Sequence, residues 1–163
     1  MRAQWPRLTA LLLGLFCLVS CGPSGLRPEQ GISSALKRSA DSRRWPSLGN
    51  RWLVSIASRN GRERVELVDL RNGQPVPLPG INQADAQPIS VSVSADGNRI
   101  ALIRSRDGRT ELMLYRRGVG ILQRLPVEPA GVPREVSLDG SGRLLAVQVS
   151  RQGRWDVDLI RLP

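Results

Sequence analysis

The chain of 163 residues contains no histidine and only two cysteines, Cys17 and Cys21. Without histidine, it lacks every imidazole-based acid–base mechanism and every histidine-ligated metal site. Two cysteines are too few for a four-cysteine zinc cluster or for a disulfide framework. The sequence therefore predicts no cofactor and no metal ion.

Aromatic residues and lysine are also scarce. Phe, Trp and Tyr make up 4% of the chain, far fewer than the stacking platforms of proteins that bind single-stranded nucleic acid. Of the 24 basic residues only Lys37 is a lysine, and the formal net charge is +10. In a cytosolic protein this charge would raise the prospect of nucleic-acid binding. The N-terminus indicates a different compartment, so we expect no nucleic-acid partner.

The first twenty residues have the pattern of an export signal. Arg2 and Arg7 precede an apolar run over residues 8–19, which is shorter than the roughly 20 residues of a membrane-spanning helix. The sequence Leu-Val-Ser-Cys at residues 18–21 resembles the lipobox of bacterial lipoproteins. That resemblance implies cleavage after residue 20 and acylation of the Cys21 thiol. An ordinary secretory peptide and an uncleaved anchor are the alternatives.

Lipidation at Cys21 would place the chain in the bacterial cell envelope. Each buried acyl methylene contributes about 0.8 kcal/mol, so two or three acyl chains give a stable membrane anchor. Gly22, rather than Asp, after the cysteine is compatible with the outer-membrane sorting of some lipoproteins. We expect the protein at the periplasmic face, where its basic surface meets solvent or anionic envelope polymers and headgroups.

A linker and a repeat domain follow the signal peptide. Residues 21–45 are rich in Gly, Pro, Ser and Arg, which predicts a flexible tether, with one or two helical turns over residues 32–40. Residues 46–163 contain three similar segments 47 and 45 residues apart. These are 58–62 (SRNGR), 105–109 (SRDGR) and 150–154 (SRQGR), each preceded by a short apolar run.

Each repeat has the pattern of a four-stranded antiparallel sheet. In residues 89–94, Ile and Val alternate with Ser, which is typical of a strand with one buried face. Asn-Gly and Asp-Gly at 60–61 and 107–108 favour two-residue hairpin turns. The third repeat lacks its outer strand. We predict an all-β fold with approximate units at 46–87, 88–132 and 133–163, the last one incomplete.

The repeats resemble those of TolB-like β-propellers. The best match is Ser94-Ala95-Asp96-Gly97 followed by a strand and the Arg-Asp-Gly hairpin at 106–108, and the similarity extends from about Trp45 to Pro163. The resemblance implies a partial propeller, which we expect to bind an envelope protein or an anionic envelope polymer. A closed propeller has 4 to 8 blades, so three blades leave two end faces uncovered. A homodimer that completes a six-bladed ring or docking on a partner would cover them.

The sequence offers little support for catalysis. Asp156 and Asp158 lie two residues apart, where they could act as acid and base, hold a cation, or simply line the exposed face of an alternating strand. Three tryptophans, Trp45, Trp52 and Trp155, are interpreted as core or inter-blade packing. We predict a binding or scaffold protein that is not an enzyme, with a lipid-anchored hydrolase of envelope glycans or peptides as the alternative.

Arginines flank each repeated turn and are candidate anion-binding or partner-binding residues. If the repeats are equivalent, these arginines project from one rim, where guanidinium groups can bind phosphate or carboxylate with two hydrogen bonds. Charged turns that simply keep the hairpins soluble are the alternative. The six residues are Arg59, Arg62, Arg106, Arg109, Arg151 and Arg154.

Overall fold

The computed structural model describes Arg27 and residues 29–163. The predicted signal peptide and Cys21 lie outside this part of the chain. Within it, no helix is long and apolar enough to cross a membrane.

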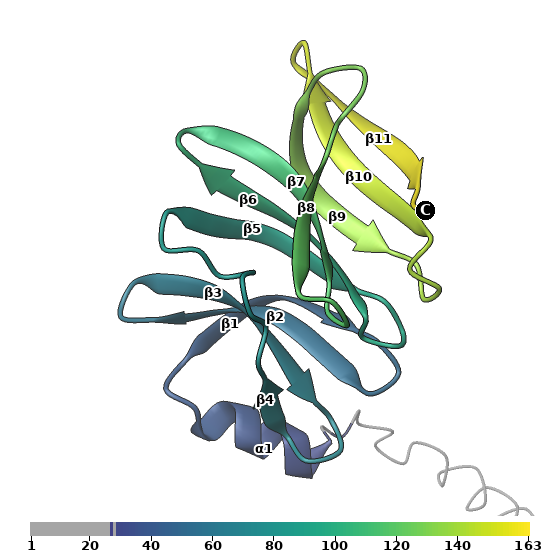
Figure 1. The fold of residues 1–163 in the computed structure, drawn as a ribbon. Coiled ribbons are helices and arrows are strands. Elements are labelled where there is room, and N and C mark those ends of the chain that lie inside the picture. Colours follow the sequence, from purple (N-terminus) through teal and green to yellow (C-terminus); the bar gives the residue numbers. More distant parts are fainter. Residues whose placement is uncertain (1–26, 28) are drawn as a thin grey trace, which may run out of the picture. The chain divides into compact units, whose positions relative to one another are not determined.

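Three antiparallel sheets follow one another along the chain (Figure 1). Blade 1 contains β1 (Ser42–Leu48), β2 (Trp52–Arg59), β3 (Arg62–Asp69) and β4 (Gln74–Val76). Blade 2 contains β5 (Ala86–Val93), β6 (Arg99–Arg106), β7 (Arg109–Arg116) and β8 (Ile121–Leu125). Blade 3 contains β9 (Val132–Leu138), β10 (Leu144–Arg151) and β11 (Arg154–Arg161). The predicted all-β repeats, with a third unit of three strands, are confirmed.

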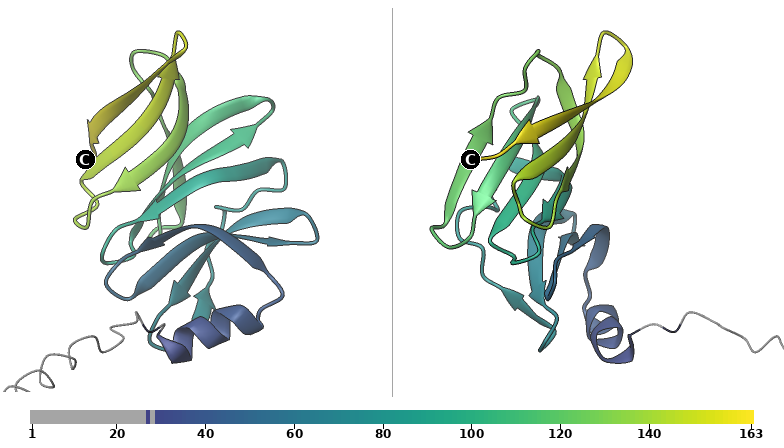
Figure 2. Two further views of the ribbon diagram at one scale, coloured as in Figure 1. Left: turned by 180° about the vertical axis from the view of Figure 1, so that it is seen from behind. Right: turned by 90° about the vertical axis from the view of Figure 1, so that its right-hand side faces the viewer.

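Each blade places its strands side by side in chain order, with β1, β5 and β9 as the first strands. Strand β5 contacts both β1 and β9, so the blades stack along one another as they do in a propeller. The stack is open, with blade 1 at one end and blade 3 at the other (Figure 2). It is therefore a partial propeller rather than a closed ring.

Two apolar cores lie between the three blades, one at each junction. Blades 1 and 2 enclose a core that includes Ile56, Leu67, Leu102 and Tyr115. Blades 2 and 3 enclose a second core, with Leu114 among its fully buried side chains. Blade 2 contributes to both cores because its strands are apolar on both faces.

Serines of the first strands connect neighbouring blades. Ser90 and Ser92, expected on a solvent-facing side, are buried. The Ser92 Oγ accepts a hydrogen bond of 2.9 Å from the Leu138 N–H, and the Ser90 Oγ accepts one of 3.2 Å from the Val136 N–H. One repeat earlier, the Ser47 Oγ accepts the Val93 N–H at 3.2 Å. The expectation of one exposed face was wrong because β5 lies between two other sheets.

The segment before residue 46 is not entirely a tether. Residues 30–38 form helix α1 (Gln30–Arg38), which overlaps the predicted helical turns at 32–40, and blade 1 already begins at Ser42. The Arg43 guanidinium donates to the Leu36 carbonyl at 3.2 Å, which ties the helix to β1. Helix α1 lies at the blade 1 end of the stack in Figures 1 and 2.

Candidate binding rim

The turns β2–β3, β6–β7 and β10–β11 lie along one edge of the stack, which we call the hairpin rim (Figure 1). Each is a two-residue turn whose residues both have positive φ: 52° and 76° at Asn60 and Gly61, 50° and 71° at Asp107 and Gly108, and 48° and 79° at Gln152 and Gly153. Positive φ at both positions defines a type I′ hairpin. The predicted equivalence of the three turns is confirmed.

The six predicted arginines form three cross-strand pairs at this rim. The strand register pairs Arg59 with Arg62, Arg106 with Arg109 and Arg151 with Arg154. The structure therefore gathers all six residues into one repeated arrangement, as the spacing predicts. The two members of each pair have different environments.

The first arginine of each pair is bound by a carboxylate. The Arg59 Nε lies 2.8 Å from Asp41, a guanidinium nitrogen of Arg106 lies 2.7 Å from Asp85, and one of Arg151 lies 2.5 Å from Asp158. Arg151 also donates to the Pro129 carbonyl. These three guanidiniums already have carboxylate partners within the chain, so they are poor candidates for binding an anionic ligand.

The second arginine of each pair is exposed. Arg62 and Arg109 form no ion pair within the described residues, and Arg154 lies 3.5 Å from Asp156, a weak contact. One unengaged or weakly engaged guanidinium therefore projects from each blade at the hairpin rim. This subset, rather than all six arginines, has the capacity to bind an anion.

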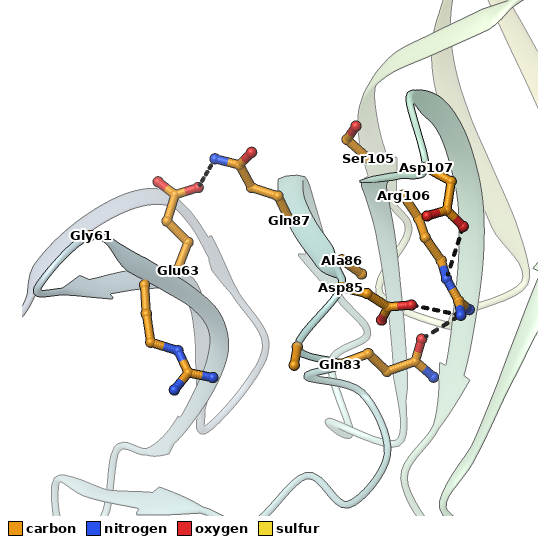
Figure 3. Close-up of a pocket in the computed structure, with 11 residues that line it drawn as sticks. Gly61, Glu63, Gln83, Asp85, Ala86, Gln87, Ser105, Arg106 and Asp107 are labelled. Carbon is orange, nitrogen blue, oxygen red and sulfur yellow. Dashed lines mark hydrogen bonds and ion pairs between the residues drawn. The ribbon is translucent and has the colours of Figure 1, made fainter.

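A groove of about 450 Å³ separates the first two hairpins of the rim (Figure 3). Its lining comprises residues 61–63, 83–87 and 105–107. Within it Gln87 donates to Glu63 at 3.1 Å, and Arg106 is held by Asp85 and Gln83. The bond from Arg44 lowers the pKa of Glu63, so this carboxylate stays ionised and paired. Arg62 is the remaining charged group of the groove without an ion-pair partner within the described residues.

Asp41 is a site residue that sequence reasoning missed. It lies between α1 and β1, its side chain is 5% exposed, and it binds Arg59 and Arg64 at 2.8 Å each. The hydrogen bonds from Arg64, Ser39 and Arg59 lower its pKa from 3.8 to about 2. A lone aspartate in a Gly/Ser/Arg-rich segment carries no local signal of these contacts, because its partners are 18 and 23 residues away.

Asp156 and Asp158 do not have the environment of an acid–base pair. Arg151 contacts both carboxylates, at 3.7 Å and 2.5 Å. The hydrogen bond from Arg151 lowers the pKa of Asp158, which keeps it ionised and unsuited to donating a proton near neutral pH. Their role is to bind the first arginine of the third hairpin.

The tryptophan prediction is confirmed at one position and wrong at two. Trp52 is buried between blades, with the Arg51 and Arg117 guanidiniums 4.5 Å and 4.4 Å from its ring centre. Trp45 and Trp155 are exposed instead, at 40% and 60%. On β11 the apolar side chains face solvent, whereas Asp156 and Asp158 are half-buried on the face that Val147 and Val149 turn towards blade 2, where Arg151 pairs with them.

No protein-family model and no curated protein matches the chain. Among solved structures, TolB from Acinetobacter baumannii aligns with a TM-score of 0.57 and 20% identity over 72% of this chain. A TolB-type protein from Agrobacterium tumefaciens aligns at 0.59 and 15% over 74%. The β-propeller domain of the Trilobed protease from Pyrococcus furiosus aligns at 0.50 and 11% over 76%.

This chain spans only 29%, 46% and 43% of those three structures. The similarity therefore concerns a subset of their blades. It shows that the described residues adopt a TolB-like partial propeller fold, which confirms the predicted architecture.

Proposed function

We propose that this protein is a lipid-anchored binding module of the bacterial cell envelope, which binds anionic groups of an envelope protein or polymer through its hairpin rim. The observation that carries the proposal is the repeated exposure of Arg62, Arg109 and Arg154, one from each blade. Three guanidiniums along one edge suit a ligand with repeated phosphate or carboxylate groups.

The internal ion pairs support a binding role for this edge. Asp41, Asp85 and Asp158 pair with the first arginine beside each turn. The second arginine, on the other side of the turn, is then the member of each pair that is left to bind a ligand. Envelope location rests on the N-terminal signal.

The role of the rim is tested by removing three positive charges at a time from the full chain. In the rim variant Arg62, Arg109 and Arg154 become Gln; in the control variant Arg71, Arg143 and Arg161 become Gln. The control residues are exposed and lie at the opposite ends of their strands or in the loops there. Both variants lose the same net charge.

Binding is measured on immobilised polyphosphate at low and moderate salt. Each charge-assisted hydrogen bond contributes roughly 1.5–3 kcal/mol, so we expect the rim variant to lose at least about tenfold in affinity. The control variant should lose much less. Equal losses in the two variants would show that net charge alone drives binding, and would refute the rim as the site.

Lipid anchoring is tested separately with Cys21→Ala expressed in a Gram-negative bacterium. The unchanged chain should incorporate radiolabelled palmitate and sediment with membranes. The variant should lose the label and enter the soluble fraction after osmotic release. Membrane sedimentation of an unlabelled variant would contradict lipid anchoring while leaving the rim experiment unaffected.

A further inference from the structure

The outward face of blade 3 repeats a surface that is buried at both junctions between blades. Leu112 and Leu114 of β7 are buried between blades 2 and 3, and the equivalent valine and leucine of β3 are buried between blades 1 and 2. Forty-five residues after the β7 pair, Val157 and Leu159 of β11 are 68% and 69% exposed. An exposed apolar surface of this kind marks an interaction site.

At both junctions the first strand of the later blade lies across this surface. Strand β5 contacts β1, β2 and β3 of blade 1, and β9 contacts β5, β6 and β7 of blade 2. Val91 and Val93 of β5 enter the first core, and Val136 and Leu138 of β9 enter the second. The segment that covers each blade is therefore extended, with aliphatic side chains at alternate positions facing the blade beneath.

A serine of the covered blade binds the covering strand. The Val93 N–H donates to the Ser47 Oγ at 3.2 Å, and the Leu138 N–H donates to the Ser92 Oγ at 2.9 Å. Ser137 follows Ser92 by 45 residues, as Ser92 follows Ser47. It is exposed, and its Oγ has no hydrogen-bond partner among the described residues. The third acceptor of the series is therefore free to bind a further strand.

The loop between the first and second strands of each blade adds a backbone link. The Asn50 N–H donates to the Ala95 carbonyl, and the Ala95 N–H donates to the Gly140 carbonyl, both at 2.9 Å. The Gly140 N–H is the next donor of this series, and it has no acceptor within the part of the chain that the structure describes. Blade 3 thus offers one acceptor and one donor where blades 1 and 2 bind the strand that covers them.

A second copy of this chain is a poor occupant of this face. Blade 1 of the second copy would have to lie on it, and the free side of blade 1 carries the ion pairs of Arg43 with Glu66 and of Arg64 with Asp41. Helix α1 also lies on that side, where it shares a cavity with the sheet. Charged groups placed on the apolar face would lose hydration without gaining partners.

We propose that the outward face of blade 3 binds an extended segment of another protein, with aliphatic side chains at alternate positions. One N–H of this segment donates to the Ser137 Oγ, and the carbonyl two residues later accepts the Gly140 N–H. The aliphatic side chains pack on Val157 and Leu159. Apolar and backbone groups carry this recognition, so the site is distinct from anion binding at the hairpin rim, and its affinity should not depend on salt.

The probe is a fluorescent peptide with the sequence of residues 131–141, GVPREVSLDGS, which contains the strand that covers blade 2. Added to the full chain in phospholipid nanodiscs, it should give a saturable rise in fluorescence anisotropy. In the control peptide Val136 and Leu138 are both replaced by Ser. This peptide should bind at least about tenfold more weakly, because it loses both apolar contacts.

Variants of the full chain locate the peptide on the blade 3 face. Val157→Lys should lower the affinity at least about tenfold, because a charge then lies under the apolar side chains. Ser137→Ala should lower it roughly two- to tenfold, the effect of one hydrogen bond. Val119→Lys, which adds the same charge at a valine of similar exposure (65%) in the β7–β8 turn, should bind as the unchanged chain does. Circular dichroism should be the same for all variants.

Several outcomes would overturn the proposal. Absence of saturable binding, equal binding of the two peptides, or full binding by Val157→Lys would each do so. If light scattering gives two chains for the unchanged protein and one for Val157→Lys, a second copy covers the face instead. The triple rim variant, with Gln at 62, 109 and 154, should bind the peptide normally. Loss of binding there, with Val157→Lys unaffected, would assign the peptide to the rim.

Discussion

The two ends of the blade stack have opposite surface character. At the blade 1 end, Glu66 occupies the repeat position of Met113, which is buried between blades 1 and 2. At the blade 3 end, Val157 and Leu159 keep the apolar character of their buried counterparts. The outward face of blade 1 is therefore charged, whereas the outward face of blade 3 is apolar.

The largest difference is expected when one leucine on the outward face of blade 2 and one on that of blade 3 are each replaced by alanine and the free energies of unfolding are compared. Leu114→Ala removes a fully buried side chain between blades 2 and 3, and should lower the free energy of unfolding by about 2–5 kcal/mol. Leu159→Ala, at the equivalent position of blade 3, should change it by no more than about 0.5 kcal/mol in the monomer. Urea denaturation at protein concentrations that keep the chain monomeric provides both values. Similar losses would mean that the blade 3 face is covered within the single chain.

The stability that Asp41 contributes at the blade 1 end should depend on pH. The folded-state pKa of Asp41 is about 2, against an ordinary value of 3.8, so the folded state binds this proton more weakly than the unfolded state does. Its contribution to stability is therefore complete above about pH 4 and is lost as the pH falls towards about 2. Asp41→Asn should lower the urea midpoint at pH 7, and the gap to the unchanged protein should close on acidification.

Asp107→Asn is the control for this titration, because the Asp107 side chain is 83% exposed. Its urea midpoint should follow that of the unchanged protein at every pH. Asp139, whose pKa is also about 2 because Ser141 and backbone N–H groups bind it, contributes equally to all three proteins and cancels in the comparison. A gap that persists at low pH would mean that Asp41 acts through packing rather than charge.

The smallest effect is expected at helix α1, which lies at the blade 1 end of the stack. Leu36 is half-buried and lines a cavity of about 380 Å³ between α1 and the sheet. Leu36→Ala should lower the free energy of unfolding by about 1 kcal/mol, since only part of its apolar surface leaves water. Arg38→Ala, on the exposed side of α1, should have almost no effect in the same denaturation assay. A loss at Leu36 as large as that at Leu114 would make the helix an integral part of the core.

The blade architecture could be predicted because the same turn and strand pattern occurs three times in the sequence. The recurring Arg-x-Gly-Arg turns fixed three hairpins, and alternating apolar residues placed the strands around them. Local patterns also predicted the arginine pairs, because a two-residue turn puts its flanking residues opposite each other. These features depend on neighbours a few residues apart.

The remaining features depend on contacts between distant segments. Ser90 and Ser92 have the sequence pattern of an exposed face, and their burial follows only from the position of β5 between two sheets. Asp41 gains its role from arginines of β2 and β3. The division of the six arginines into paired and exposed members likewise requires carboxylates from other elements, which no local pattern indicates.

Because the molecule has two separate cores, we expect it to open at one junction between blades at a time. Each is confined to one junction between blades, as in linear repeat proteins, whose cooperativity is carried by nearest neighbours. Blade 2 takes part in both junctions, whereas each outer blade takes part in one. Amide hydrogens of β6 should therefore exchange with solvent most slowly, and blade 3 can detach while the remaining pair stays native.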